Sequence, residues 1–351
     1  MAHYYVTGAA GWSGKALVNR LVNGYPEHDT LQDRLQVDSI TALVLPHEAE
    51  QLEPWKDALT IVTGDLRSPG DCASFLERAG DGILIHLAGV IHPRLFTREF
   101  QQVNVEGSRN LLSAAVENRV KRAVVMSSNS PIGCNPDREH LFDESSAYHP
   151  YMGYGRSKMQ LEQYVNGLHA SAQLETVLIR GPWFYGPFQP ARQTTFFEMI
   201  RDGKAPIVGD GNNIRSMVYV DNLAQGLLLA AVSEKADGQT YWIADEKPYT
   251  MNEIINTVEY LLANDFAIEC KYSRMKLPSV ASEIAYLVDW LLQSAGLYQQ
   301  KIHVLSEMNK NIACSVSRAK HDLGYQPLVS LEQGMRHSIQ QLIDQGQLKQ
   351  H

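Results

Sequence analysis

The chain has 351 residues, 44% hydrophobic and 20% charged, which is the composition of a globular protein with a large core and about two domains. A formal charge of −8 without a basic stripe excludes a general nucleic-acid binder. Four scattered cysteines show no C-x-x-C or zinc spacing, so we expect reduced thiols and no metal site. An apolar run begins almost at once, leaving no room for a signal peptide, and we expect a cytoplasmic protein.

Short apolar runs alternate with helical patterns in the first half of the chain. Strands are expected at His3–Thr7, Ile40–Leu45, Leu59–Val62, Gly82–Leu87, Ala123–Ser127 and Thr176–Ile179, and helices at 14–23, 70–79, 99–118 and 153–170. This alternation predicts an α/β fold of the Rossmann type, a doubly wound parallel sheet with helices on both faces. Such sheets bind ligands at the carboxyl ends of their strands.

After Gly181 the pattern changes to Gly- and Pro-rich turns, with helices expected at 220–233, 251–263, 278–293 and 331–344. We therefore expect residues 1–180 to form a dinucleotide-binding domain. Residues 181–351 should mostly form a smaller substrate-binding lobe, with some segments returning to the first domain.

The most membrane-like stretch is Ile284–Leu292, which is too short to span a bilayer and is interrupted by Asp289. We expect an amphipathic helix that completes the core, and no membrane span.

A glycine-rich loop, Gly8-Ala-Ala-Gly-Trp-Ser-Gly14, follows the first apolar run and opens into a helix. Gly8 permits a tight turn, Gly11 lets the backbone approach phosphates, and Gly14 lets helix and strand pack closely. The free N–H groups of the helix would then face the pyrophosphate of a dinucleotide. A plain tight turn is the alternative for this loop taken alone.

Tyr154 and Lys158 form a Y-x-x-x-K pattern whose spacing places both side chains on one face of a helix. A free tyrosine has a pKa near ~10, and a lysine cation one turn away would favour its phenolate form. Ser127 and Ser128 lie at the end of an expected strand, where a hydroxyl can bind a substrate oxygen. Each pattern alone also fits an ordinary helix face or a serine-rich turn.

Taken together, these motifs resemble the extended short-chain dehydrogenase/reductase superfamily, in particular its NAD-dependent epimerase/dehydratase family. The resemblance continues through the segments Gly64–Leu66, His86–Gly89, Asn104–Leu112, Arg180–Pro187, Tyr219–Asn222 and Ser317–Pro327. It therefore covers nearly the whole chain.

The resemblance implies hydride transfer between nicotinamide and a secondary alcohol or ketone carbon. Tyr154 would be the acid/base, Lys158 its partner and a ribose contact, and Ser128 a catalytic and substrate-binding residue, since Gly133 follows it where the family commonly has a glycine. The implied cofactor-binding residues are Gly8, Gly11, Trp12, Ser13, Gly14, Asp65, Leu66, Ala88, Gly89 and Lys158. The family also implies a homodimer formed through the helices at 99–118 and 153–170.

Two departures from the family pattern bear on cofactor and reaction. The second expected strand ends in Leu45-Pro46, with neither the acidic residue usual for NAD nor the arginine usual for NADP. The lack of a basic residue favours NAD and leaves NADP open. Asn129-Ser130 stands where sugar dehydratases carry Asp-Glu, so we do not expect dehydration.

Two substrate classes fit the sequence, and we expect the first of them, a nucleotide-activated sugar. Arg215 follows Gly209-Asp-Gly211 at the position of a diphosphate-binding arginine, which favours an epimerase or reductase of a nucleotide-activated sugar. Ser216 follows it where that group usually has aspartate, and a second arginine is missing, with Lys310 the nearest cation.

The alternative is a dehydrogenase of a hydrophobic alcohol. The stretch Leu277–Leu292 followed by Lys301–Met308 is similar to the apolar insert of 3β-hydroxysteroid dehydrogenase-like members. A non-catalytic dinucleotide-sensing protein on the same fold is a third hypothesis.

Overall fold

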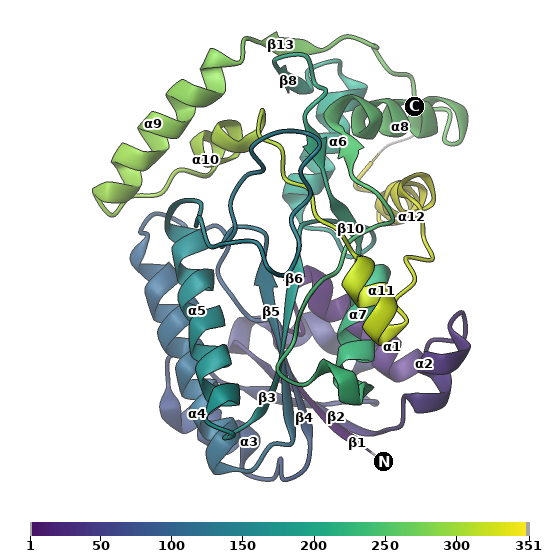
Figure 1. Cartoon of the computed structure of the whole chain (residues 1–351). Helices are drawn as coiled ribbons and strands as arrows, with labels where there is room; N and C mark the ends of the chain where they lie inside the picture. The colour runs from purple at the N-terminus through teal and green to yellow at the C-terminus, as the bar shows by residue number, and fades with distance from the viewer. Residues whose placement is uncertain (1, 349–351) are drawn as a thin grey trace.

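A seven-stranded parallel sheet forms the centre of the structure, a computed structural model that describes residues 2–348 (Figure 1). Its strands follow the order β11-β6-β5-β4-β1-β2-β3, and every neighbouring pair is parallel. The bounds of these strands are β1 Ala2–Thr7, β2 Val37–Val44, β3 Thr60–Thr63, β4 Ile83–His86, β5 Arg122–Ser128, β6 Glu175–Gly181 and β11 Thr240–Trp242. The predicted parallel α/β sheet is confirmed.

Helices cover both faces of the sheet, with α1 and α7 on one side and α3, α4 and α5 on the other (Figure 1). The helices are α1 Trp12–Asn23, α2 Asp29–Arg34, η1 Pro46–Trp55, α3 Pro69–Leu76, η2 Phe100–Gly107, α4 Ser108–Glu117, α5 Met152–Ala170, α6 Ala191–Arg201, α7 Val220–Val232, η3 Glu234–Ala236, α8 Met251–Asn264, α9 Val280–Ser294, α10 Gln300–Glu307, α11 Ser317–Leu323 and α12 Leu331–Asp344. Every residue of β5 is buried, so the core lies along the middle of the sheet.

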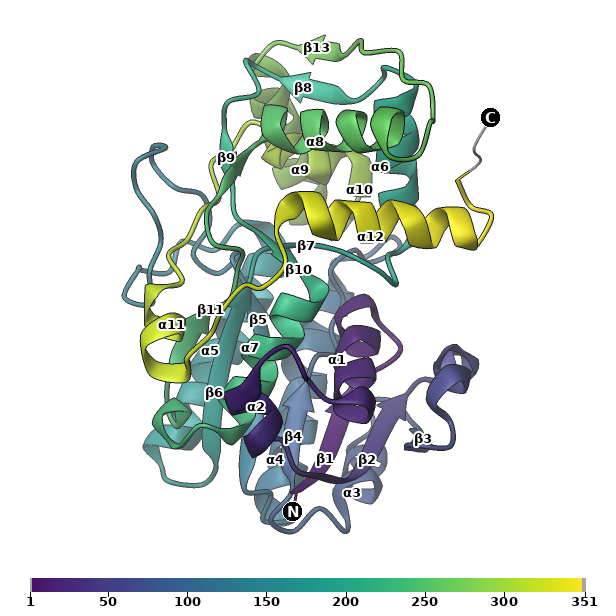
Figure 2. The same cartoon turned by 90° about the vertical axis from the view of Figure 1, so that its right-hand side faces the viewer.

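The smaller lobe stands over the carboxyl ends of the strands and contains α6, α8, α9, α10 and α12 (Figure 2). Three two-stranded sheets complete it: β7 (Trp183–Tyr185) with β10 (Met217–Tyr219), β9 (Ile214–Arg215) with β12 (Tyr249–Thr250), and β8 (Pro206–Val208) with β13 (Met275–Leu277). It has its own apolar core around Phe197, Ile254 and Met335. Helix α7 and strand β11 come later in the chain than residue 180 but pack on the large sheet.

Three details differ from the sequence predictions. Strand β2 begins at Val37, three residues earlier than expected, because Val37 pairs with Ala2 at the start of β1. The seventh strand, β11, was not predicted because only three residues form it. The expected helix at 99–118 begins with the π-helical segment η2, whose wider turn carries the fully buried Asn104.

Helix α9 does not complete the core, so that prediction was wrong. Its buried side chains include the polar residues Ser282, Asp289 and Gln293, whereas Leu287 and Leu291 are more than half exposed. The polar side of α9 faces inward and its apolar side outward, because the polar groups form hydrogen bonds with α10 and with the start of α5.

A buried carboxylate fixes α5 to the sheet. Glu162 of α5 accepts hydrogen bonds from Ser127 Oγ of β5 at 2.5 Å, from Arg180 Nη2 of β6 at 2.7 Å and from Tyr148 Oη at 2.9 Å. Glu162 and Arg180 are both almost completely buried. One side chain therefore joins two central strands, a loop and the helix that carries Tyr154 and Lys158.

We expect Glu162→Ala to lower the free energy of unfolding by about 3–5 kcal/mol, because it leaves the Arg180 cation buried without its partner. Urea denaturation measures this change. The exposed pair Lys56–Glu53 provides the control, and Glu53→Ala should change stability by less than about 1 kcal/mol. Equal effects of the two substitutions would contradict the role given to Glu162.

Candidate active site

The glycine loop forms the tight turn that its sequence predicts. Gly8 has a φ of +73°, and a Cβ there would lie 2.6 Å from the backbone nitrogen of Ala88. A Cβ on Gly14 would lie 2.0 Å from the carbonyl oxygen of Gly8. Helix α1 begins directly after Gly11, with no side-chain cap and no acidic residue in its first turn. This cradle fits a dinucleotide, because its uncapped N–H groups can bind phosphate oxygens.

Trp12 and Ser13 lie at the start of α1 and are half-buried. The indole nitrogen of Trp12 donates a hydrogen bond to the carbonyl oxygen of Pro187 at 2.7 Å. This bond joins the glycine loop to the segment that leads into the smaller lobe.

Glu48 lies in the first turn of η1, which follows the second strand, and makes a contact that the sequence did not predict. Its carboxylate accepts a hydrogen bond from the backbone nitrogen of Leu45 at 3.1 Å and so caps η1.

At the end of β3, Asp65 pairs with Arg67, whose guanidinium lowers the pKa of the Asp65 carboxyl. Leu66 beside it is buried.

Gly89, after β4, lies beside two polar side chains. A Cβ on Gly89 would come within 3.2 Å of Asn104 Oδ1 and 3.4 Å of Lys158 Nζ. Ala88 precedes it, and its backbone nitrogen donates to Thr7 Oγ1 at 3.4 Å. The predicted cofactor residues after β1 and β4 therefore lie next to one another and to Lys158.

Asn104 is a residue of this region that the sequence analysis left without a role. Its carboxamide accepts from the Val90 backbone nitrogen at 2.7 Å, and donates to the Val90 carbonyl at 2.9 Å and to Ser157 Oγ at 3.1 Å. It thereby fixes the segment after Gly89 against α5. Asn104 opens one of the segments that resemble the family, which marked the position but did not identify this contact.

Ser128, Tyr154 and Lys158 come together at the carboxyl end of β5, and all three are buried. The Ser128 hydroxyl lies close enough to the Tyr154 phenol to act on its pKa, and it donates to Asn129 Oδ1 at 3.3 Å. Lys158 Nζ donates to the carbonyl oxygen of Met126 at 2.9 Å. The β5 strand and the first two turns of α5 thus position a hydroxyl, a phenol and an amine within one site.

Burial controls the protonation of these groups. It raises the pKa of Tyr154 to about 12, although the neighbouring Ser128 hydroxyl opposes the shift. It lowers the pKa of Lys158 to about 8, although the Glu162 carboxylate opposes that shift. Lys158 was expected to lower the pKa of Tyr154, but the burial of the phenol outweighs any such effect.

Aromatic side chains line the space beside Tyr154. The ring of Phe100 lies 5.9 Å from those of both Tyr154 and Tyr298, and the three residues form one buried cluster. His92 Nδ1 and Tyr298 Oη are hydrogen-bonded at 2.6 Å, and burial lowers the pKa of His92 to about 4.

Helices α9 and α10 close this side of the site with buried polar groups. His303 Nδ1 is hydrogen-bonded to Asp289 Oδ2 at 2.7 Å. Burial acts to lower the pKa of His303, but Asp289 and Glu307 shift it upward overall. The four-residue spacing of Asp289 and Gln293 in an apolar segment is the signal that could have predicted this inward polar face.

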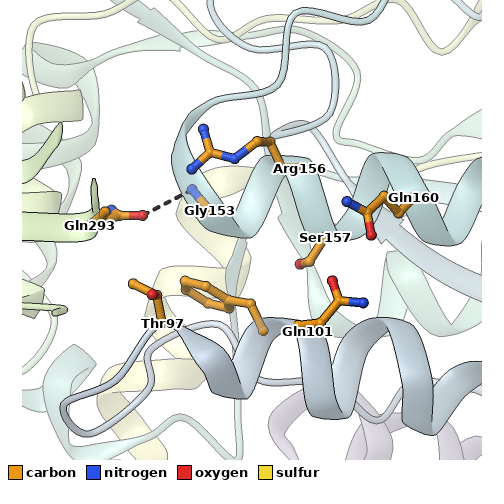
Figure 3. A pocket seen from close by; sticks show the side chains of 8 residues that line it. Thr97, Gln101, Gly153, Arg156, Ser157, Gln160 and Gln293 are labelled. Carbon is orange, nitrogen blue, oxygen red and sulfur yellow. Dashed lines mark hydrogen bonds between the residues drawn. The ribbon is translucent and has the colours of Figure 1, made fainter. Parts of the chain in front are cut away.

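Gln293 also connects α9 to α5. Its Oε1 accepts a hydrogen bond from the backbone nitrogen of Gly153 at 2.9 Å, as Figure 3 shows.

The neighbouring pocket, about 170 Å³ in volume, lies between α5 and η2 and is lined in part by Gln101, Arg156 and Gln160. Arg156 and Gln160 lie on a different face of α5 from Tyr154 and Lys158, whereas Phe100 of η2 lines this pocket and also packs against Tyr154.

Arg215, the predicted diphosphate contact, is buried in β9. Its guanidinium donates a hydrogen bond to the carbonyl oxygen of Glu307 and lies over the Trp183 ring, 5.9 Å from the ring centre. Within residues 2–348 its Nε has no partner. The side chain is therefore held mainly by the end of α10.

Across residues 2–348 no group of three or more His, Cys, Asp or Glu side chains is arranged to hold a metal ion. The thiols of Cys72, Cys134, Cys270 and Cys314 are free.

We expect Lys158→Met to change how stability depends on pH. Between pH 8 and 10.5 the unfolded lysine keeps a proton that the folded one has lost, so this group makes the free energy of unfolding rise with pH. The difference in that free energy, wild type minus variant, should grow by about 1 kcal/mol per pH unit above pH 8. Urea unfolding from neutral pH to about pH 9.5 covers most of this window.

Exposed Lys56 provides the control for this experiment, and Lys56→Met should leave the pH dependence unchanged. Parallel curves for the wild type and Lys158→Met would contradict the lowered pKa of the buried Lys158 amine.

The chain shows clear similarity to known proteins. Residues 4–244 match the model of the NAD dependent epimerase/dehydratase family. The uncharacterized protein y4nL of Sinorhizobium fredii is 47% identical, over 97% of this chain and 95% of its own length.

Two further relatives carry names that describe an activity. The 3beta-hydroxysteroid-dehydrogenase/decarboxylase isoform 1 of Arabidopsis thaliana is 28% identical, over 95% of this chain and 78% of its own. The 2-alkyl-3-oxoalkanoate reductase of Shewanella oneidensis is 25% identical, over 96% of this chain and 85% of its own.

Among solved structures, the dTDP-glucose 4,6-dehydratase DesIV of Streptomyces venezuelae, with NAD and TYD bound, has a similar fold. It superimposes with a TM-score of 0.75 at 23% identity and covers 97% of both chains. At this identity the likeness concerns the fold alone.

Proposed function

The chain belongs to the NAD-dependent epimerase/dehydratase family, and from this membership we propose that it transfers a hydride between NAD and a secondary alcohol or ketone carbon of a hydrophobic substrate. The family resemblance drawn from the motifs is thereby confirmed, and the chain is an NAD-dependent enzyme of the extended short-chain dehydrogenase/reductase type. The observation that carries the proposed reaction is the position of Ser128 and Tyr154 side by side at the end of β5, with Lys158 one turn further along α5 and all three side chains buried.

Each of these three residues has a distinct role in the proposed reaction. NAD, when bound, supplies the carbon that accepts or returns the hydride. Tyr154 takes the hydroxyl proton of the substrate during oxidation and gives it back during reduction. Ser128 binds the reacting oxygen, and the Lys158 cation favours the Tyr154 phenolate. The glycine loop at residues 8–14 would hold the pyrophosphate of NAD. The segment around Gly89 would lie beside its nicotinamide half.

Two observations support a hydrophobic substrate in place of the nucleotide-activated sugar expected from the sequence. The surroundings of Tyr154 are aromatic, with Phe100 and Tyr298 in contact and Val90 packed against them. Arg215, which would have to bind the diphosphate of a sugar nucleotide, already donates to the Glu307 carbonyl. The names of the two relatives, a hydroxysteroid dehydrogenase and an oxoalkanoate reductase, agree with this choice.

We expect Tyr154→Phe to lower kcat by about 10²–10⁴-fold, because the general acid/base is lost, while the affinity for NADH changes little. The absorbance of NADH reports turnover with sterols and other hydrophobic alcohols or ketones, and its fluorescence reports binding. Tyr164 lies on the same helix and contacts Ser113, so Tyr164→Phe is the matched control and should keep full activity. Full activity of Tyr154→Phe would refute the proposed chemistry.

The nucleotide-sugar alternative depends on Arg215, whose Nε is buried without a partner among the described residues. If the substrate is a sugar nucleotide, Arg215→Met should raise KM for UDP-glucose or dTDP-glucose by about tenfold or more, because a charge-assisted hydrogen bond is lost. If the substrate is hydrophobic, the same variant should leave KM for the alcohol nearly unchanged.

Whether the protein retains its cofactor also distinguishes an epimerase of a sugar nucleotide from a dehydrogenase of a hydrophobic alcohol. An epimerase keeps its nicotinamide through each turnover, whereas a dehydrogenase exchanges it. Denaturing the purified protein and assaying the released nicotinamide distinguishes these cases. A protein that carries a full complement of bound NAD and turns over without added cofactor would overturn the dehydrogenase proposal.

We also infer NAD rather than NADP as the exchanged cofactor, a homodimer formed through η2, α4 and α5, and a cytoplasmic location. Sedimentation velocity tests the dimer.

A further inference from the structure

Helix α9 exposes an apolar face to solvent. The members of this α9 face are between 37% and 58% exposed, and they are Val280, Ile284, Tyr286, Leu287, Val288, Trp290 and Leu291. Val280, Ile284, Leu287 and Leu291 follow the three- and four-residue spacing of one helical stripe. Figure 1 places α9 at the outer edge of the smaller lobe, with α10 on its inner side. Seven large apolar side chains exposed together on one helix mark a site of interaction.

The helix is held in this orientation by its polar side. Ser282 Oγ donates to the carbonyl oxygens of Leu305 and Ser306, each at 2.9 Å. Asp289 is hydrogen-bonded to His303 of α10, and Gln293 binds the backbone of α5. Turning the apolar stripe inward would break these bonds and bury unpaired polar groups, so the exposed face is a fixed feature of the fold.

The apolar surface continues beyond the helix onto the loop at 91–98. Phe96 forms a β-bridge with Leu297, and the Tyr298 backbone nitrogen donates to the Leu95 carbonyl at 2.7 Å. Leu95 and Phe96 are 50% and 41% exposed. The loop therefore extends the α9 face past the end of the helix.

Cations flank this surface. Arg94, Arg98, Lys276 and Lys301 are exposed, and none has an ion-pair partner within residues 2–348. The one exposed acid of α9, Glu283, is paired with Lys310 at 2.5 Å. An excess of positive charge at this place contrasts with the net charge of −8 of the whole chain.

We propose that the α9 face docks the protein on the surface of an anionic lipid bilayer. An amphipathic helix can lie in the plane of the interface with its apolar side among the acyl chains, and a Trp such as Trp290 suits the headgroup level. The flanking Arg and Lys side chains bind anionic headgroups. None of the helices described in residues 2–348 has the length and apolar character needed to cross a bilayer, so the contact is peripheral.

A second copy of the chain fits this surface less well. A twofold interface places the same residues of two copies against each other, so the four unpaired cations of one copy would approach those of the other. Like charges brought together in this way oppose association. An anionic membrane neutralises the same cations.

Vesicle flotation tests the proposal directly. The wild type should bind phosphatidylcholine vesicles that contain phosphatidylglycerol, bind pure phosphatidylcholine vesicles less, and release as salt rises. Leu287→Glu/Leu291→Glu should reduce the partition coefficient by about tenfold or more, because it places charge on the inserted side. Arg94→Gln/Arg98→Gln should reduce it by about tenfold on anionic vesicles only.

Tyr260→Glu/Leu328→Glu is the matched control, since it places the same charges on two large exposed hydrophobic residues outside α9. Its vesicle binding should equal that of the wild type. A blue shift of the fluorescence on vesicles that disappears in Trp290→Phe would locate the contact at α9.

Several outcomes would overturn the proposal. These are a wild type that binds neither vesicle, equal binding to both vesicle types at all salt concentrations, or equal losses in the α9 variant and its control. Sedimentation in lipid-free buffer measures the mass of the protein and so tests whether the α9 face is an interface between two copies of the chain. A mass that falls in Leu287→Glu/Leu291→Glu but not in the control would identify the face as an interface between copies.

Discussion

The relation of α5 to the sheet depends on the buried carboxylate of Glu162. It binds groups from β5, β6 and the segment before α5, and it lies one turn beyond Lys158 on the same helix. The helix can therefore neither rotate nor slide without leaving Arg180 unpaired. Since Ser128 ends the strand that carries Ser127, the same contact sets the distance between the hydroxyl of Ser128 and the phenol of Tyr154. A structural ion pair thus fixes the geometry on which the proposed chemistry depends.

Much of the fold was predictable because its signals are local. The glycine loop predicts a tight turn before a helix, and the spacing of Tyr154 and Lys158 predicts one face of α5, since neither depends on a distant partner. The meeting of Ser128 with these residues followed from strand order and family resemblance. The roles of these residues stay predictions, although the structure brings them together.

Features set by distant partners were not predictable. Asn104 acts through a backbone segment on another element, and Arg215 donates to the end of a helix far along the chain. The orientation of α9 was predicted wrongly because its composition is apolar, whereas three polar residues with partners on α10 and α5 decide which side is buried. The spacing of apolar residues predicts that α9 is a helix. Which of its sides is buried depends on the hydrogen-bond partners of its few polar residues.

Strand β11 determines when the sheet can be completed during synthesis. It pairs with β6, and α7 covers β5 and β6, yet both elements follow the segment that begins the smaller lobe. Until residue 242 has left the ribosome, β6 presents an open edge that can pair with another chain. The nascent dinucleotide-binding half is therefore open to aggregation until most of the protein has been made. For the same reason, a fragment cut after residue 180 would keep that edge exposed permanently.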